Sequence, residues 1–272
     1  DFSLLFMKYQ GIYFMKKTLI ALAVAASAAV SGSAMAWTAN GTSGSVDLGG
    51  TLTPVEKVTP WEVKTGAAVN GLDADIRKGD TKVSIPVKKA ISVLGIRTAQ
   101  KAVFPGQPGI APQIDFKGAV AYEKFSGSVT DLTLSVTDNQ GAVIGKLKAP
   151  FIAGGKYSVT GPDANSLYHM NASAAGQAFF GGLPVTKAAT GDVMSRVNAI
   201  DSEFSEHFIG QGIDLTGIGY GNSFSNTKHK YSSYYGSGIE AGAKIQITLN
   251  QAASGDEPIQ WKASLPVTVS YQ

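Results

Sequence analysis

Hydrophobic and polar residues alternate along several short runs of this chain. In TKVSIPV the apolar side chains of Val83, Ile85 and Val87 share one face, and DLTLSVT and KIQITLN repeat the pattern further on. The turn sequence DNQG at 138–141 separates DLTLSVT from a returning run, AVIGKL. Many short alternating runs divided by turn residues predict an all-β fold, a sandwich of the immunoglobulin-like kind.

The last run, WKASLPVTVSYQ, has the most regular alternation. Its apolar face carries Trp261, Ala263, Leu265, Val267, Val269 and Tyr271. Pro266 cannot donate a ladder hydrogen bond, which favours a position at a sheet edge. Because an apolar edge strand aggregates unless it is paired, a second strand should cover it. We expect the edge that accepts this strand to contain Leu265, Val267, Val269 and Tyr271.

An early run, SGSVDLGGTL, alternates like a strand but has few residues that would stabilise one. Val46, Leu48, Gly50 and Leu52 lie on one face, but glycines interrupt the run and the loose stretch WTANGTSG precedes it. One interpretation is an ordinary first strand of the chain's own sandwich. The other is a donor strand, which leaves its own sandwich incomplete and completes that of a neighbouring subunit by strand addition. A glycine in the row suits a shallow pocket, so the second interpretation makes these four positions the donor residues.

One segment has helical spacing instead. From Asp192 the sequence DVMSRVNAIDSEFSEHFIG repeats apolar residues every three or four positions, with Thr190 or Asp192 as the N-cap and Gly210 as the end. Before it, from about residue 151 to 191, the alternation fades, and we expect a second short helix near 166–175. Together these stretches predict a small helix-containing insertion at about 152–212.

The beginning of the chain reads as a secretory leader. A basic Met15-Lys16-Lys17 precedes an apolar run and the small-residue site Ala34-Met35-Ala36. We therefore expect 1–14 to be an upstream segment foreign to the protein and 15–36 a signal peptide. Under the second interpretation 37–53 is the donor strand, and 54–272 is the immunoglobulin-like domain that contains the insertion. Cleavage after Ala36 leaves 236 of the 272 residues.

Charge and cysteine content narrow the classes of function. Removing Lys8, Lys16, Lys17 and Asp1 from the 23 basic and 20 acidic residues leaves 20 and 19, a formal net charge of +1. This balance gives no indication of a nucleic-acid partner. The chain has no cysteine, so it has neither a disulfide nor a thiol nucleophile.

Motifs for catalysis or metal binding are missing from the sequence. The histidines at 169, 207 and 229 have no partner at metal-ligand spacing, and GIGYG at 217–221 lacks the dinucleotide fingerprint. We therefore predict no enzyme activity, no catalytic residue, no metal and no cofactor. In KHKYSSYYGSG, the rings of Tyr231, Tyr234 and Tyr235 either stack on sugars or are ordinary surface tyrosines of a turn and strand.

Short matches along the chain resemble one family. They include the leader followed by GSVDLGG, and PWEVKTG, PQIDF, FFGGL, SRVNA and the end QWKASLPVTVSYQ. These segments resemble the FaeG/FaeH/ClpG-like fimbrial subunits of enterotoxigenic Escherichia coli, over most of the mature chain.

The resemblance implies a subunit of an extracellular fimbria on the bacterial surface. Such subunits are exported through the periplasm and assembled with neighbouring subunits by a periplasmic chaperone and an outer-membrane usher. Some members are also adhesins, which bind galactose-containing host glycoconjugates through the insertion. The matching region is about 158–191, and it adds Tyr168 and His169 to the candidate glycan-binding residues.

The sequence thus predicts a structural fimbrial subunit that polymerises by donor-strand exchange, with glycan adhesion as an additional role. The alternative is a secreted soluble lectin or carbohydrate-active protein that completes its sandwich with its own first strand.

Overall fold

The computed structural model describes residues 39, 41, 43–55 and 58–272, which fall into two units divided after Val58. The expected upstream segment and signal peptide lie outside the described residues. In the first unit, 43–55 is extended and forms no strand. The second unit, 59–272, holds all the helices and strands of the described residues.

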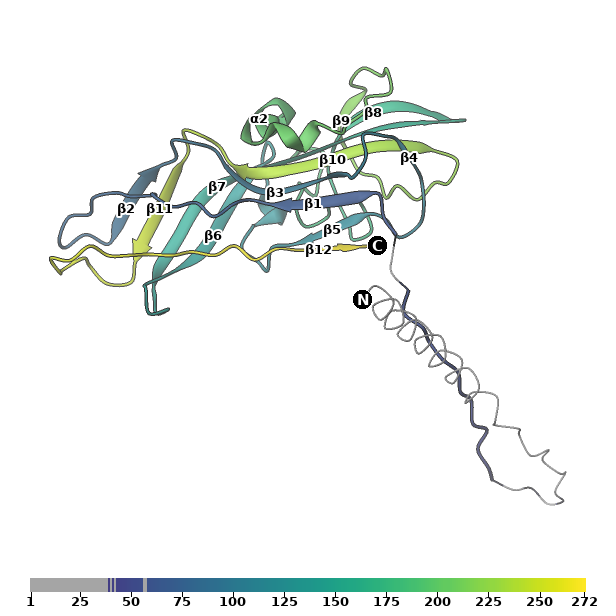
Figure 1. Ribbon diagram of the computed structural model, residues 1–272, viewed down its shortest axis with the longest axis horizontal. Coiled ribbons are helices and arrows are strands. Elements are labelled where there is room, and N and C mark those ends of the chain that lie inside the picture. Colours follow the sequence, from purple (N-terminus) through teal and green to yellow (C-terminus); the bar gives the residue numbers. More distant parts are fainter. Residues whose placement is uncertain (1–38, 40, 42, 56–57) are drawn as a thin grey trace, which may run out of the picture. The chain divides into compact units, whose positions relative to one another are not determined.

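The second unit is an all-β, sandwich-like fold, as the alternating runs predict (Figure 1). Its main sheet follows the order β1–β3–β10–β7–β11–β2, and β12 pairs with β5 in a separate two-stranded sheet. The bounds are β1 Trp61–Thr65, β2 Lys82–Pro86, β3 Ile91–Thr98, β4 Phe104–Pro105, β5 Pro112–Asp115, β6 Val129–Thr137, β7 Val143–Gly161, β8 Ala164–Met170, β9 Gly217–Tyr220, β10 Lys230–Ile239, β11 Lys244–Leu249 and β12 Thr268–Tyr271.

Strand β7 organises the main sheet, because it is 19 residues long and has two sets of neighbours. Its first half lies between β6 and β11, and its second half between β8 and β10. The turn between β6 and β7 forms as expected, since the Asp138 carboxylate accepts hydrogen bonds from the amides of Gln140 and Ala142, both 2.9 Å long. The predicted insertion at about 152 begins inside this uninterrupted strand.

Two helix predictions have different outcomes. The expected helix near 166–175 is wrong, since β8 occupies most of that range as the partner of β7. The helix after Asp192 is present but short, with α2 at Met194–Ile200 and a 3₁₀ turn, η2, at Ser202–Ser205. Asp201 is extended between them and its carboxylate accepts the Glu203 amide, which starts the second turn. The N-cap of α2 is Val193, which makes no side-chain capping hydrogen bond, instead of the predicted Thr190 or Asp192.

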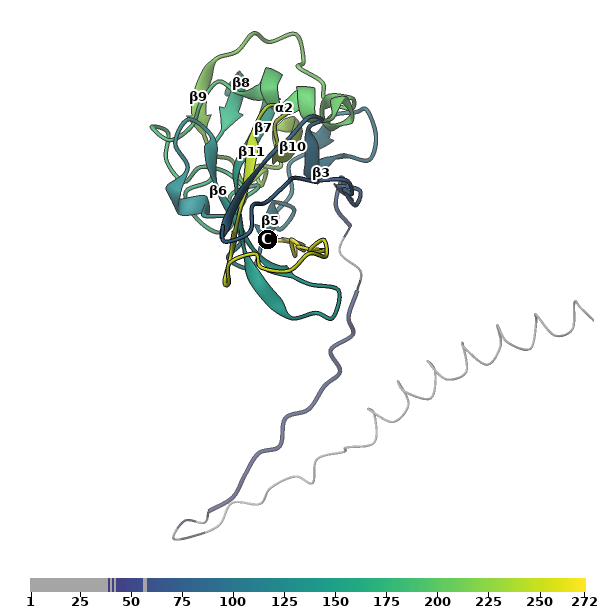
Figure 2. The ribbon, with the colours of Figure 1, turned by 90° about the vertical axis from the view of Figure 1, so that its left-hand side faces the viewer.

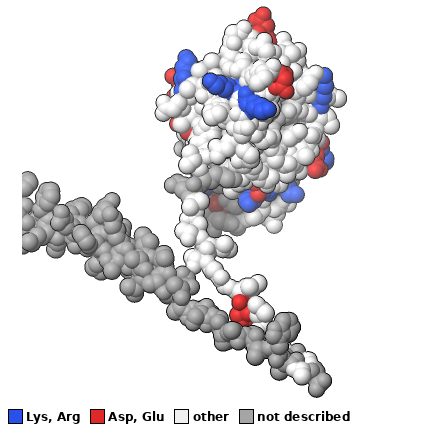
Figure 3. Space-filling model, turned by 90° about the vertical axis from the view of Figure 1, so that its right-hand side faces the viewer, with Lys and Arg blue, Asp and Glu red and all other residues white. Residues whose placement is uncertain are grey.

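Side chains of α2 and η2 pack on the main sheet and form a second, smaller core with β7 and β10. Figure 2 shows α2 and the C-terminus on opposite sides of the main sheet. Within the described residues no helix is long and apolar enough to cross a membrane. Charged groups on the face drawn in Figure 3 are few and scattered.

Candidate functional site

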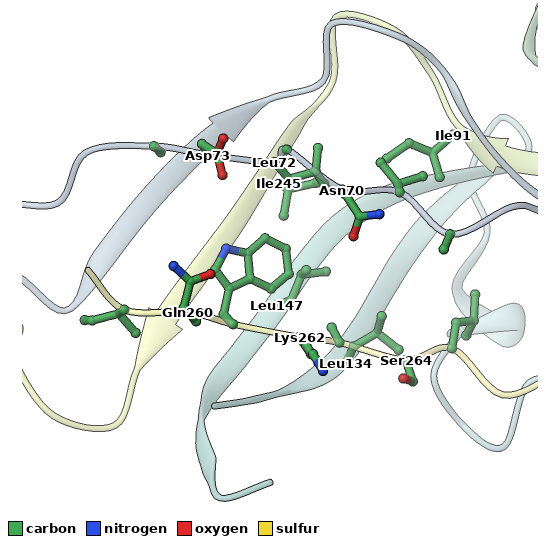
Figure 4. A pocket seen from close by; sticks show the side chains of 18 of the residues that line it. Asn70, Leu72, Asp73, Ile91, Leu134, Leu147, Ile245, Gln260, Lys262 and Ser264 are labelled. Atoms are coloured by element: carbon green, nitrogen blue, oxygen red, sulfur yellow. The ribbon is translucent and has the colours of Figure 1, made fainter. Parts of the chain in front are cut away.

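A groove of about 1270 Å³ lies beside the C-terminal segment. One wall is the irregular segment 66–76 that follows β1, and the other is 258–267, which leads into β12. Figure 4 shows Leu134, Leu147 and Ile245 between these two walls. The groove therefore opens onto the core of the fold.

The floor of the groove is apolar because it is made by inward faces of sheet strands. Leu132 and Leu134 come from β6, Leu147 from β7 and Ile245 from β11. Leu132, Leu147 and Ile245 are buried, whereas the inward residues of the C-terminal wall, such as Leu265, are only half-buried. The wall thus presents hydrophobic surface that the chain itself covers incompletely.

Both walls have unpaired backbones. Among the residues that the structure describes, no backbone hydrogen bond is made by 67–76 or by 263–267. Peptide groups at such an edge are free to pair with another strand. The groove consequently has the form of a sheet from which one strand is missing.

The direction of the free peptide groups follows from their neighbours. Lys262 exchanges hydrogen bonds of 2.8 and 2.9 Å with Thr137, and Gln272 exchanges bonds of 2.9 and 3.0 Å with Ala111. Residues two apart in an extended strand direct their peptide groups to the same side. The backbone N–H and C=O groups of the even-numbered residues of this segment therefore point toward β5 and β6, and those of the odd-numbered residues point toward the groove.

Pro266 has a different consequence from the one expected. As an even-numbered residue it lacks a donor on the side of β5 and β6, so the groove edge keeps all its N–H groups. The proline interrupts pairing inside the molecule without weakening the edge that faces the groove.

The charged side chains of the groove lie on its walls and at its ends, and none lies on its floor. Lys78, two residues beyond the first wall, forms an ion pair with Asp256, two residues before the second, and this pair joins the two segments at one end of the groove. Lys262 is exposed and lies on the C-terminal wall, where Figure 4 labels it. The interior of the groove holds no ion pair among the described residues, which suits an apolar strand.

The expected acceptor residues divide into two groups. Leu265 and Val267 line the groove, but Val269 and Tyr271 lie beyond it, in the part of the segment that pairs with β5. Trp261 and Ala263 also line the groove, and they belong to the same alternating face, although the predicted acceptor residues do not include them. The 66–76 wall could not be predicted, because AAVNGLDADI has no clear alternation.

The expected donor residues are among the most exposed of the chain. Val46, Leu48 and Leu52 expose 84%, 93% and 97% of their surface. A fully exposed leucine forgoes about 1.5–3 kcal/mol of burial energy. Three such residues in one row are therefore typical of a segment that is buried by a partner.

Three of the candidate glycan-binding tyrosines are packing residues, which corrects that part of the prediction. Tyr231, Tyr234 and Tyr235 are at most 1% exposed, because β10 is covered on both faces: Tyr231 and Tyr235 pack in the main core, and Tyr234 packs in the smaller core with α2 and η2. Burial raises the pKa of Tyr234 to about 12. His169 is buried too, and burial lowers its pKa despite Asp192, whose carboxylate is 3.3 Å from Nδ1.

Tyr168 keeps access to the surface. It stacks on Tyr220 of β9 with ring centroids 4.2 Å apart, and the Lys187 ammonium lies 4.6 Å from the centroid of the Tyr220 ring. Nothing in the sequence connects these three residues. The parallel pairing of β8 and β9 brings the two tyrosines together, and Lys187 comes from the segment between β8 and α2.

The acidic residues near His207 have a structural role. Asp201 and Glu203 bind Lys64 of β1, with N–O distances of 3.0 and 2.5 Å, and Glu206 binds Arg97 of β3. They fasten η2 to the sheet. In the part of the chain that the structure describes, no three His, Cys, Asp or Glu side chains are grouped to hold a metal ion.

Comparisons with known proteins give a consistent result. A family model described as "Fimbrial, major and minor subunit" matches residues 15–272. Among curated Escherichia coli proteins, K88 fimbrial protein AC is 32% identical over 286 residues, K88 fimbrial protein AB is 30% identical over 294, and F41 fimbrial protein is 30% identical over 282. Each alignment covers 94% of this chain and 100% of the relative.

Proposed function

Because the chain belongs to the family of major and minor fimbrial subunits, we propose that it polymerises by donor-strand exchange. As a member of that family it is a structural subunit of a surface appendage and not an enzyme. In the proposal, the exposed segment around 44–53 of one subunit enters the groove of the next. The observation that carries it is the apolar groove between two walls with unpaired backbones.

The exchange would bury the exposed apolar row of one subunit in the groove of the next and would pair the free backbone edge of that groove. Val46, Leu48 and Leu52 would leave water and contact the floor of the groove. The groove-facing peptide groups of Ala263, Leu265 and Val267 would find partners in the donor backbone. Polar residues on the other face of the donor would remain in solvent.

Before assembly the open groove requires a temporary cover. We propose that a periplasmic chaperone supplies a strand to the edge at Leu265 and Val267 after export by the signal peptide, and that an outer-membrane usher then exchanges it for the donor. An uncovered apolar edge in the periplasm would aggregate.

Two adjacent donor positions provide a matched test. Leu52→Asp puts a charge into the groove and should reduce fimbrial polymer by more than about tenfold, since burying an unpaired carboxylate costs several kcal/mol. Thr51→Asp introduces the same charge one residue earlier, on the solvent face, and should assemble normally. Polymer is measured as detergent-resistant ladders on gels. Equal assembly by the two variants would refute the donor role.

The alternative, a soluble lectin that uses its own first strand, has less support. Residues 43–55 belong to no strand of the second unit in the described chain, and the relatives are named as fimbrial proteins.

A glycan-binding role is a second candidate, favoured by the Tyr168–Tyr220 pair. Exposed aromatic rings bind the apolar face of sugars such as galactose, and the Lys187 ammonium beside them can donate hydrogen bonds to sugar hydroxyls. Tyr220 is 39% exposed. We propose this corner of β8 and β9 as the site on the fimbria that contacts host glycoconjugates.

Binding of assembled fimbriae to an array of galactose-containing glycans tests this role. Tyr220→Ala should abolish the binding, whereas Tyr122→Ala, a change of a half-buried tyrosine elsewhere on the fold, should preserve it. Unchanged binding by Tyr220→Ala, or no binding by the unmodified fimbriae, would exclude this site.

A further inference from the structure

The irregular wall of the groove contains an asparagine followed by a glycine, Asn70 and Gly71, near the middle of 66–76. We propose that Asn70 is a site of spontaneous deamidation, which replaces its neutral amide by a carboxylate while a subunit remains unassembled. The modification itself depends only on these two residues and their surroundings. Its effect on assembly rests on the proposed strand exchange.

The reaction needs a nucleophile, an amide and water. The backbone nitrogen of Gly71 loses its proton to hydroxide and attacks Cγ of Asn70. The new N–C bond closes a cyclic imide, and the side-chain nitrogen leaves as ammonia. Water then adds to either carbonyl carbon of the imide and opens the ring. One opening gives aspartate, and the other gives isoaspartate, whose main chain runs through the former side chain.

The structure leaves the attacking nitrogen free. Among the residues that the structure describes, no backbone or side-chain group accepts a hydrogen bond from the N–H of Gly71. Asn70 and Gly71 are both exposed, and neither belongs to a helix or a strand. A Cβ atom built on Gly71 would meet no heavy atom within 4 Å. Solvent therefore reaches the reacting atoms, and no packing holds them apart.

The glycine at position 71 distinguishes Asn70 from the other asparagines. A side chain on the following residue crowds the approach of its nitrogen to Cγ, whereas glycine leaves the backbone free to make that approach. Every other asparagine of the described chain precedes a residue with a side chain. Asn40 also precedes a glycine, but it lies outside the described residues.

Two other asparagines show how the fold restrains the same reaction. The amide that follows Asn139 donates a hydrogen bond of 2.9 Å to the Asp138 carboxylate. The amide that follows Asn171 donates one of 2.9 Å to the Pro184 carbonyl, and Asn171 itself is buried. Such a nitrogen must give up its hydrogen bond before it can attack, which adds to the barrier.

Deamidation changes the wall in charge and in backbone. Both products carry a carboxylate at a position that lines the groove, where Figure 4 labels Asn70. The same wall already holds Asp73 and Asp75, so the new charge adds to their repulsion. Isoaspartate also inserts Cβ into the main chain, which displaces the later peptide groups of the wall from their place in the alternation.

The consequence under the proposed exchange is a time limit on unassembled subunits. A strand that enters the groove would meet a charged and irregular wall in a deamidated subunit, and it would pair poorly. In a polymer the incoming strand would cover Asn70 and restrain the peptide groups around it, so that deamidation slows. Subunits that remain unassembled would thus lose the groove, whereas assembled subunits would keep it.

Peptide mapping tests the modification. Trypsin cleaves after Lys64 and Arg77, and the product TGAAVNGLDADIR contains no other asparagine and no glutamine. The full chain carrying Leu48→Asp and Leu52→Asp, which keep it unassembled, is incubated at mildly acidic and at mildly alkaline pH. Mass spectrometry should find the change from amide to carboxylate in this peptide, with both products, and faster at alkaline pH because hydroxide removes the proton.

The matched control is the synthetic peptide TGAAVNGLDADIR, free in solution under the same conditions. Conversion of the free peptide with none in the folded chain would overturn the site. In detergent-resistant polymer of the unmodified chain, the same peptide should retain its amide for longer than in the unassembled chain. Equal conversion in the two samples would overturn the protection by assembly.

Polymer yield tests the consequence. Asn70→Asp is the aspartate product itself, and it should give at least about tenfold less polymer than Asn70→Gln, which keeps an amide. Alkaline incubation before assembly should lower the yield of the unmodified chain, whereas Asn70→Gln should keep the yield that it has before incubation. Equal yields from the two variants would overturn the time limit. If the unmodified chain forms no polymer either, strand exchange itself is refuted, and the mass measurement still decides the modification.

Discussion

At the scale of single residues, His169 shows how burial changes the meaning of a side chain. The sequence makes it a candidate sugar ligand next to Tyr168. In the fold it lies in β8, inside the sheet, with the Asp192 carboxylate and the Lys156 ammonium as its charged neighbours. Burial dominates and lowers the pKa of His169 below its usual value of 6.5, so the neutral ring is the folded form at neutral pH.

The pH dependence of stability follows from that shift. In the unfolded chain the histidine takes up a proton near pH 6.5, but the folded chain binds it only at lower pH, so stability falls as the pH drops below about 6.5. His169→Gln removes this proton and should flatten the fall of the melting temperature between pH 7 and pH 5. The measurement is thermal unfolding of both proteins across that range. Parallel curves would show that His169 does not contribute.

At the scale of elements, α2 and η2 pack closely against the main sheet at a row of three glycines. Gly95 of β3, Gly236 of β10 and Gly154 of β7 are paired in register across three strands. Phe204 of η2 covers the first two, and Met194 of α2 covers the third. Glycine is required because any side chain would occupy the space that these residues fill.

Gly236→Ala therefore should destabilise the second unit by about 1–3 kcal/mol, as other overpacked sites do. The added Cβ would lie 2.3 Å from Cδ2 of Phe204 and 2.8 Å from Cγ1 of Val197. Gly210→Ala is the control, since its Cβ would meet only Leu167 at 3.6 Å, an ordinary contact. Denaturant unfolding of the two variants measures the difference, and similar midpoints would refute the role of the glycine row.

At the scale of the whole molecule, the chain separates its exposed apolar row from its exposed apolar groove. The two surfaces belong to different units. Under the proposed strand exchange, a subunit on its own should be less stable than one within a polymer, because binding to the folded state adds stability.

A peptide of residues 43–55 should reproduce this gain. It is added to the full chain carrying Leu48→Asp and Leu52→Asp, which cannot donate its own strand. At a concentration of about one hundred times Kd it should add about 2.7 kcal/mol, or roughly 5–10 °C in Tm. A peptide with the same two substitutions is the control and should have no effect. Equal shifts with both peptides would count against a specific groove.

Much of the fold could be predicted because alternation is a local property. The runs around Ile85, Leu132 and Ile245 became strands with those residues buried, as expected. The helix predicted after Asp192 is too long, because the backbone becomes extended at Asp201 and ends α2 there. The Asp201 carboxylate accepts the Glu203 amide and forms an ion pair with Lys64, a residue distant in sequence. The second helix was wrong because pairing with β7 decides the conformation of 164–170.

The site could be predicted only in part. Alternation alone identified the apolar row from Val46 to Leu52 and the inward face that ends at Tyr271. It gave no information on the 66–76 wall, on the floor residues shared by β6, β7 and β11, or on the burial of Tyr231, Tyr234 and Tyr235, because these depend on which strands become neighbours.

The sequence by itself determined the faces of the strands and the apolar, glycine-interrupted row near the N-terminus, because side-chain direction in an extended chain depends only on position along it. The tertiary structure alone decided that two segments far apart in sequence remain unpaired across an apolar floor, since strand neighbours and free backbone edges are properties of the whole sheet.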